Sequence, residues 1–352
     1  MRKHVLFFVH GMGVYVDGQG KASNAWSQSA AKLLKQQYQK YAVAKRKSFD
    51  DTFEVVHINY DVEFHKLVTR WADESAKVTA LAIPAAAPAQ KLLKWLNGAR
   101  ETDANFAWTH FSDVVLYKFF ELMRQRVKIS VANQFQSALA PNHEGAVSSW
   151  SVIAHSLGTS ITHDVLHALD ATTSNQAGIS ILDAMVPSAT VIAMIANVSK
   201  VMEGRDVDVY NSMVVPSSMV QNQSVCFQYL NCNNKFDPFV QPVPFKPTGP
   251  QWALAESNQT YVDIPIENIH ETNVHSLANY LVNPAVHIAL LERMLGFGTI
   301  SEAEKKKAHD TFENVPQELL LDGAVKLAGL AQDTDWFEMV GKYFALLELA
   351  NV

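Results

Sequence analysis

The ten residues WSVIAHSLGT, at positions 150–159, decide the fold of this chain. Their apolar first half predicts a short buried strand, and a helical pattern runs from Thr159 to Ala171. The polar pair His155-Ser156 lies at the sharp turn between them. A serine hydroxyl is a weak nucleophile that needs exposure and a neighbouring base, and this turn would raise it above a sheet edge. The competing interpretation is an ordinary serine N-cap.

The same segment resembles the G-x-S-x-G nucleophile elbow of the α/β-hydrolase family in its lipase-like form, with Ala154 in place of the first glycine. The resemblance implies that Ser156 is the nucleophile and that the N–H of Leu157 binds the oxyanion. His155 and Gly158 are then supporting residues. It also implies the α/β-hydrolase fold, with a mostly parallel central sheet and helices on both faces.

A second segment, FFVHGMG at residues 7–13, ends the first expected strand in a loop whose glycines allow close backbone approach. It lacks the ending of a phosphate loop and the spacing of a dinucleotide-binding loop. Its His-Gly pair resembles the oxyanion loop of lipase-like α/β-hydrolases. The resemblance implies that Met12 N–H is the second oxyanion donor and that His10 and Gly11 support it.

The resemblance also implies that the catalytic acid and base follow the nucleophile in the order Asp or Glu, then His. Asp237 follows a β-rich run and opens an Asp-Pro loop, so we expect it to be the acid, with Asp263 in reserve. His275 leads into a long predicted helix and resembles the histidine segment of the family. We therefore expect His275 to be the base, with His270 as the alternative.

Short β-rich runs alternate with helical segments, a pattern typical of a parallel sheet that is covered on both faces. The expected strands are residues 5–9, 53–60, 150–154, 190–196, 224–231 and 260–266, with 179–184 competing for the fourth place. The expected helices include residues 24–44, 159–171 and 276–295.

These elements predict a catalytic domain at residues 1–298. Within it, residues 61–136 are too long for a normal crossover and predict a helical cap insertion. The aromatic residues of this segment could line a lid over an acyl group or only bury the cap against the sheet. Residues 299–352 predict a C-terminal helical extension that packs on the core.

The composition excludes several classes of partner. Hydrophobic residues make up 48% and charged residues 18%, which favours a folded protein over a disordered one. A formal net charge of −6 offers no positive field to hold nucleic acid. The short apolar run after Met1 has no signal-peptide cleavage site, and no segment predicts a transmembrane span. We therefore expect a cytoplasmic protein, with signal-less export as the alternative.

The cysteines and the other candidate ligands predict no cofactor. Cys226 and Cys232 do not form a Cys-x-x-Cys pair, so we expect two buried thiols. No group of His and Asp residues has the spacing of a metal site. The predicted triad itself needs no cofactor and no metal.

Together these predictions describe a serine hydrolase that cleaves a small-molecule or lipid-like carboxylic ester through an acyl-enzyme at Ser156. An amidase, thioesterase or acyltransferase would use the same triad. The rival from another class is a non-catalytic binding or scaffold protein with the same fold. The sequence leaves the oligomeric state and any protein partner open.

Overall fold

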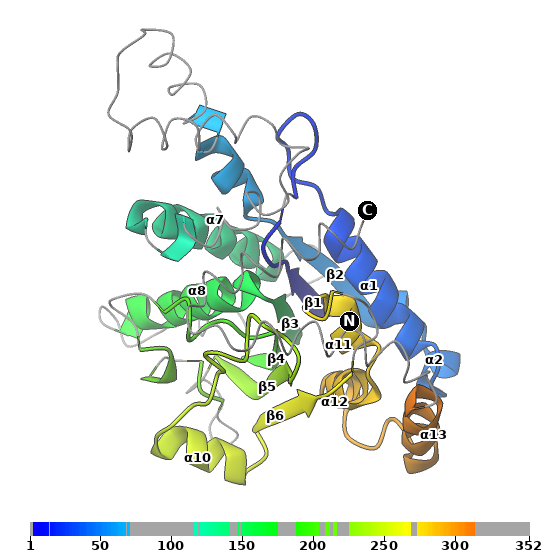
Figure 1. Ribbon diagram of the computed structural model, residues 1–352. Coiled ribbons are helices and arrows are strands. Elements are labelled where there is room, and N and C mark those ends of the chain that lie inside the picture. Colours follow the sequence, from blue (N-terminus) through cyan, green and yellow to red (C-terminus); the bar gives the residue numbers. More distant parts are fainter. Residues whose placement is uncertain are drawn as a thin grey trace, which may run out of the picture.

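The protein is described from a computed structural model. The structure describes residues 3–13, 15–67, 69–70, 116–118, 120–140, 147, 149–174, 188–203, 208–211, 214–216, 225–268 and 273–313. They form an α/β fold around a six-stranded parallel sheet (Figure 1). None of the helices in these ranges has the length and apolarity needed to span a bilayer.

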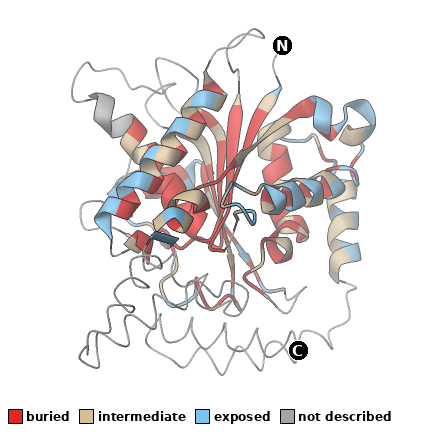
Figure 2. Cartoon of the chain, turned by 90° about the horizontal axis from the view of Figure 1, so that it is seen from above, coloured by how far each residue is buried: buried red, intermediate tan, exposed pale blue. Residues whose placement is uncertain are grey.

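The strands lie in the order β2-β1-β3-β4-β5-β6. Their bounds are β1 (His4–Val9), β2 (Phe53–Ile58), β3 (Trp150–His155), β4 (Ala189–Ile195), β5 (Cys226–Asn234) and β6 (Tyr261–Ile266). The central strands β1, β3 and β4 are almost wholly buried, because helices cover both faces of the sheet (Figure 2). Both cysteines lie buried on β5 as free thiols, which confirms their prediction.

Two helical layers enclose the sheet (Figure 1). One face carries α7 (Glu121–Leu139) and α8 (Leu157–Ser174), and the other carries α1 (Ala25–Tyr38), α11 (Leu277–Leu281) and α12 (Pro284–Leu295). Further helices are α2 (Val43–Arg46), α3 (Phe49–Thr52), α10 (Pro250–Ser257), α13 (Glu302–Glu313) and the short 3-10 helix η1 (Val209–Asn211), and residues 61–67, 69–70 and 116–118 are also helical.

Strand β4 confirms the favoured choice of residues 190–196, whereas the competing segment 179–184 lies outside the described residues. Strand β5 runs to Asn234, three residues further than expected. Its asparagines are tolerated because the side chains of Asn231 and Asn233 donate hydrogen bonds of 2.7 and 2.9 Å to Asp263 on β6.

Two predicted helices are each divided in the structure. The segment 24–44 breaks after Tyr38, and Tyr41 instead reaches His287 on α12 with a 2.7 Å hydrogen bond. The segment 276–295 breaks at Pro284, which has no N–H to continue a helix. The side chain of Asn283 accepts from the N–H of Ala285 at 2.9 Å and so begins α12 anew.

The predicted cap at residues 61–136 stays a prediction. Helix α7 falls mostly within this range, yet it packs on the sheet. Its apolar stripe includes Val127, Val131 and Phe135, and the Phe135 ring lies 4.5 Å from that of Phe7 on β1. Residues 71–115, most of the predicted cap, lie outside the described residues.

The predicted extension at residues 299–352 is described only in its first part. Helix α13 packs on α12, where Lys305 forms a 2.9 Å ion pair with Glu292. Residues 314–352 lie outside the described residues.

Candidate active site

The candidate site lies where the order of the strands reverses. The chain passes from β1 outward to β2 and then returns to β3 on the other side of β1. In open parallel sheets the loops that leave two such strands diverge and form a crevice at the carboxyl edge. Val9 pairs with Ala154, so β1 and β3 end at the same level. The two loops singled out in the sequence therefore meet here.

The turn between β3 and α8 has the strained geometry expected of an elbow. Ser156 has a φ of 53°, a left-handed conformation that is uncommon for a residue other than glycine. Its N–H donates to the carbonyl of Ile195 on β4 at 3.0 Å, and its own carbonyl accepts from the N–H of Thr159 at 2.8 Å. These bonds hold the serine between strand and helix.

Close packing explains the two glycines beside this turn. A Cβ at Gly158 would lie 2.2 Å from the carbonyl oxygen of His10. A Cβ at Gly11 would lie 2.8 Å from the Cβ of Ser156. The loop after β1 and the start of α8 thus touch through their backbones, and only glycine leaves room for that contact.

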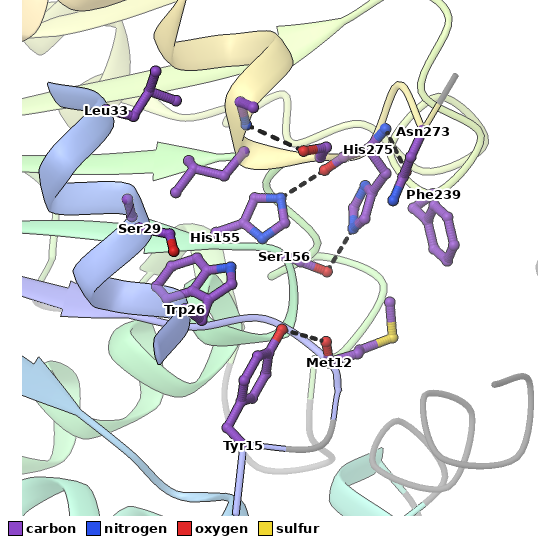
Figure 3. Close-up of a pocket in the computed structure, with 14 residues that line it drawn as sticks. Met12, Tyr15, Trp26, Ser29, Leu33, His155, Ser156, Phe239, Asn273 and His275 are labelled. Carbon is purple, nitrogen blue, oxygen red and sulfur yellow. Dashed lines mark hydrogen bonds between the residues drawn. The ribbon is translucent and has the colours of Figure 1, made fainter. Parts of the chain in front are cut away.

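Ser156, His275 and Asp237 form a continuous hydrogen-bonded chain. Nε2 of His275 lies 2.7 Å from Oγ of Ser156. Nδ1 of His275 lies 2.8 and 3.0 Å from the two carboxylate oxygens of Asp237. Figure 3 shows the imidazole of His275 directed at the Ser156 hydroxyl. All three side chains are at least nine-tenths buried.

The buried carboxylate of Asp237 has donors on both oxygens. The hydroxyl of Tyr280 donates to Oδ2 at 2.6 Å, and the N–H of Phe239 donates to Oδ1 at 3.0 Å. Burial alone would raise the pKa of Asp237, but the adjacent His275 and these hydrogen bonds hold it below its ordinary value. Asp237 is therefore an anion that can stabilise an imidazolium at His275.

His155 holds the backbone of His275 in place. Its Nε2–H donates to the carbonyl of His275 at 2.7 Å, and burial lowers the pKa of His155 to about 3. The neutral ring lies between Trp26, at a centroid distance of 6.1 Å, and His275, at 5.0 Å (Figure 3). On its other side, the His275 ring packs on Phe239 at 4.2 Å. Sequence patterns do not identify these contacts, nor that of Tyr280, because the partners are distant along the chain.

Hydrogen bonds to its carbonyls orient the loop that carries Met12. The hydroxyl of Tyr60 lies 2.8 Å from the carbonyl oxygen of His10 and 2.7 Å from that of Gly11, and Nδ1 of His10 also donates to Gly11 at 2.8 Å. The hydroxyl of Tyr15 donates to the Met12 carbonyl at 3.0 Å. A trans peptide directs its N–H opposite to its C=O. The N–H of Met12 therefore points away from Tyr60.

Leu157 is the first residue of α8 and directly follows Ser156. Its N–H has no acceptor within the helix, since the first N–H groups of a helix lack one. The N-terminal end of a helix also carries partial positive charge. Leu157 and Met12 thus come from the two loops that flank Ser156, as the resemblance implies for the oxyanion donors.

The two alternative residues do not join this cluster. Asp263 lies on the edge strand β6, where it accepts hydrogen bonds from Asn231 and Asn233 on β5. His270 lies outside the described residues. Among the residues that the structure describes, no group of three or more His, Cys, Asp or Glu side chains is arranged to hold a metal ion.

A pocket of about 340 Å³ opens beside the Ser156 hydroxyl. Its described walls come from the β1 loop, α1, the elbow and the His275 loop, and are Met12, Tyr15, Trp26, Ser29, Ala30, Leu33, His155, Ser156, Phe239, Asn273, His275, Ser276, Leu277 and Ala278. A substrate in this pocket would meet the hydroxyl and the imidazole together.

Comparisons with models of known families, with curated proteins and with solved structures found no match for this chain.

Proposed function

We propose that the protein is a serine hydrolase of the α/β-hydrolase type that cleaves carboxylic esters. The observation that carries the proposal is the chain from the Ser156 hydroxyl to the His275 imidazole at 2.7 Å and on to the Asp237 carboxylate at 2.8 Å. Nucleophilic acyl transfer requires a hydroxyl, a base that accepts its proton and an anion that orients the base, and this hydrogen-bonded chain contains all three in that order.

Three further features support the α/β-hydrolase type. The chain order is Ser156, Asp237, His275, which is the order of that class. The serine occupies a strained turn between a strand and a helix. The sheet is parallel, and the site lies at its carboxyl edge beside the reversal of strand order.

In the proposed first half-reaction, Ser156 Oγ attacks the ester carbonyl carbon while Nε2 of His275 takes the hydroxyl proton. The Met12 and Leu157 N–H groups stabilise the oxyanion, and Asp237 stabilises the imidazolium. The tetrahedral intermediate expels the alcohol oxygen, which receives the proton from His275. Water then attacks the acyl-enzyme with His275 as base, and the carboxylic acid leaves as Ser156 regains its proton.

An amide, a thioester or acyl transfer to another alcohol would use the same steps with another leaving group or acceptor. We place esters ahead of amides because an ester carbonyl is more electrophilic than the resonance-stabilised carbonyl of an amide. The rival function is non-catalytic binding. In that case Ser156 would not react with an ester or with an active-site probe.

Active-site labelling tests the proposal. The wild-type protein is incubated with a fluorophosphonate probe, and labelling is followed on gels and by peptide mass. We expect one stoichiometric adduct on Ser156, and none in Ser156→Ala. Ser160→Ala, which removes another buried serine of α8, should keep the label. An unlabelled wild type with no hydrolysis of p-nitrophenyl acetate would favour the binding function.

A further inference from the structure

One face of α1 forms the wall of the pocket beside Ser156. Trp26, Ala30 and Leu33 follow one another at helical spacing and all line the pocket. Leu277 and Ala278 at the start of α11 line it from the His275 loop. Figure 3 places Trp26 and Leu33 on one side of His155, with Ser156 and His275 on the other.

The described walls of this pocket contain no Lys, Arg, Asp or Glu side chain. Apart from His275, the only imidazole in the described walls is His155, which is neutral because burial lowers its pKa to about 3. A charged group that entered would lose its hydration and find no counter-ion. The pocket therefore selects against ionised substituents.

The pocket is also small and largely apolar. Its 340 Å³ lies near the lower end of the range of about 300–1,000 Å³ for ligand sites. Its buried apolar lining includes Met12, Ala30 and Phe239, each at most 7% exposed. This space suits one short hydrocarbon chain or one small aromatic ring.

We propose that this pocket binds the acyl group of a small, uncharged ester, and that Ala30 sets the length of acyl chain that fits. The inference rests on the proposed hydrolase function and specifies its substrate class. The acyl group must stay attached to Ser156 until water attacks, whereas the alcohol has to leave. A partly enclosed, apolar pocket fits the group that stays.

Substitution of Ala30 tests the depth of the pocket. We compare kcat/KM for p-nitrophenyl hexanoate and p-nitrophenyl acetate, which share one leaving group. In Ala30→Leu the hexanoate-to-acetate ratio should fall about tenfold, the order of effect that a methylene or two has in a hydrophobic pocket. The control Gln28→Leu adds a similar side chain at an exposed position outside the pocket and should leave the ratio unchanged.

Ala30 is buried, so folding is checked separately. Stoichiometric fluorophosphonate labelling of Ala30→Leu shows that its triad is assembled. If that variant does not fold, Ser29→Leu is used, since Ser29 is exposed and lines the same pocket, and the same fall is expected. An unchanged ratio in a labelled variant overturns the assignment.

Two further series complete the test, the first on the wild type and the second on Ala30→Leu with esters of different alcohols. A neutral butyryl ester should exceed the corresponding succinic half-ester in kcat/KM by at least about tenfold, because only the latter brings a carboxylate into the pocket. Equal rates overturn the assignment of an uncharged acyl group. The second series compares esters that share one acyl group and differ in their alcohol. If Ala30→Leu changes the selectivity among these esters and not among acyl chains, the pocket binds the alcohol and the proposal is wrong. Failure of the wild type to label would instead refute the hydrolase function itself.

Discussion

The hydroxyl of Tyr280 and the side chain of His275 meet on the same oxygen of Asp237, at 2.6 and 2.8 Å. The carboxylate is fully buried, so each donor replaces hydration that it lost on folding. Tyr280 lies five residues beyond His275, in α11, and thus couples that helix to the proposed catalytic acid.

Tyr280→Phe should reduce kcat/KM for a p-nitrophenyl ester by about tenfold, since a hydrogen bond to a charged group contributes about 1.5–3 kcal/mol. Loss of this donor raises the pKa of Asp237 and weakens its hold on the imidazole. Tyr117→Phe is the matched control, because Tyr117 is equally buried and donates to Asp164 at 2.5 Å. It should lower the free energy of unfolding and leave kcat/KM nearly unchanged. Equal kinetic losses in both variants would refute this role for Tyr280.

Tyr60→Phe should lower kcat by about tenfold with little change in KM. The variant frees the carbonyls of His10 and Gly11, and the Met12 N–H is then less firmly oriented toward the oxyanion. Affinity for a trifluoromethyl ketone, which forms a tetrahedral adduct, should fall in parallel with kcat. Tyr38→Phe removes a buried hydroxyl that donates to the Lys47 carbonyl at 2.7 Å and should change neither quantity. An unaltered kcat in Tyr60→Phe would contradict the expectation.

Gly158→Ala should slow fluorophosphonate labelling and destabilise the fold by about 1–3 kcal/mol, the usual cost of overpacking. The new methyl group would collide with the backbone of His10 and of Val9. Urea unfolding and the labelling rate measure the two effects. Gly18→Ala is the control, because a Cβ there meets nothing within 4 Å, and both quantities should stay at wild-type values. Wild-type labelling in Gly158→Ala would show that the close contact is unnecessary.

Acid should destabilise the protein through buried histidines, and His287 gives a direct test. Burial lowers its pKa from 6.5 to about 4. Between these values the unfolded chain binds a proton that the folded chain does not, so stability falls as pH drops from 6.5 toward 4, by up to about 1.4 kcal/mol per pH unit.

The variant His287→Gln keeps an acceptor for Tyr41 and has no proton to bind. Urea unfolding at pH 7.5, 6 and 5 should therefore show a shallower decline in stability for this variant below pH 6.5. Parallel curves for wild type and His287→Gln would exclude the proposed titration.

The sequence predicts the sheet well because parallel strands that are buried on both faces leave continuous apolar runs. It predicts the elbow because Ala154, Ser156 and Gly158 satisfy a local steric requirement. Element ends are harder to predict. Strand β5 continues to Asn234 because Asn231 and Asn233 bond to Asp263 on β6, and Pro284 interrupts the helical pattern of residues 276–295 and begins a new helix.

The positioning contacts of the site could not be predicted in the same way. His155 and His275 are 120 residues apart, and Tyr60 reaches back 50 residues to His10. Such pairs depend on how distant strands align at one edge of the sheet. A local sequence pattern does not predict this alignment. The sequence places most of α7 in the predicted cap for a similar reason. Its apolar stripe predicts a buried helix face but does not indicate which surface that face contacts.

The arrangement of the triad along the chain has a consequence during synthesis. Ser156 is made 119 residues before His275, with β5 and β6 between them in the chain. A nascent polypeptide that ends before residue 275 therefore lacks the proposed base. On the proposed mechanism, the serine becomes reactive only once translation has passed the last strand of the sheet.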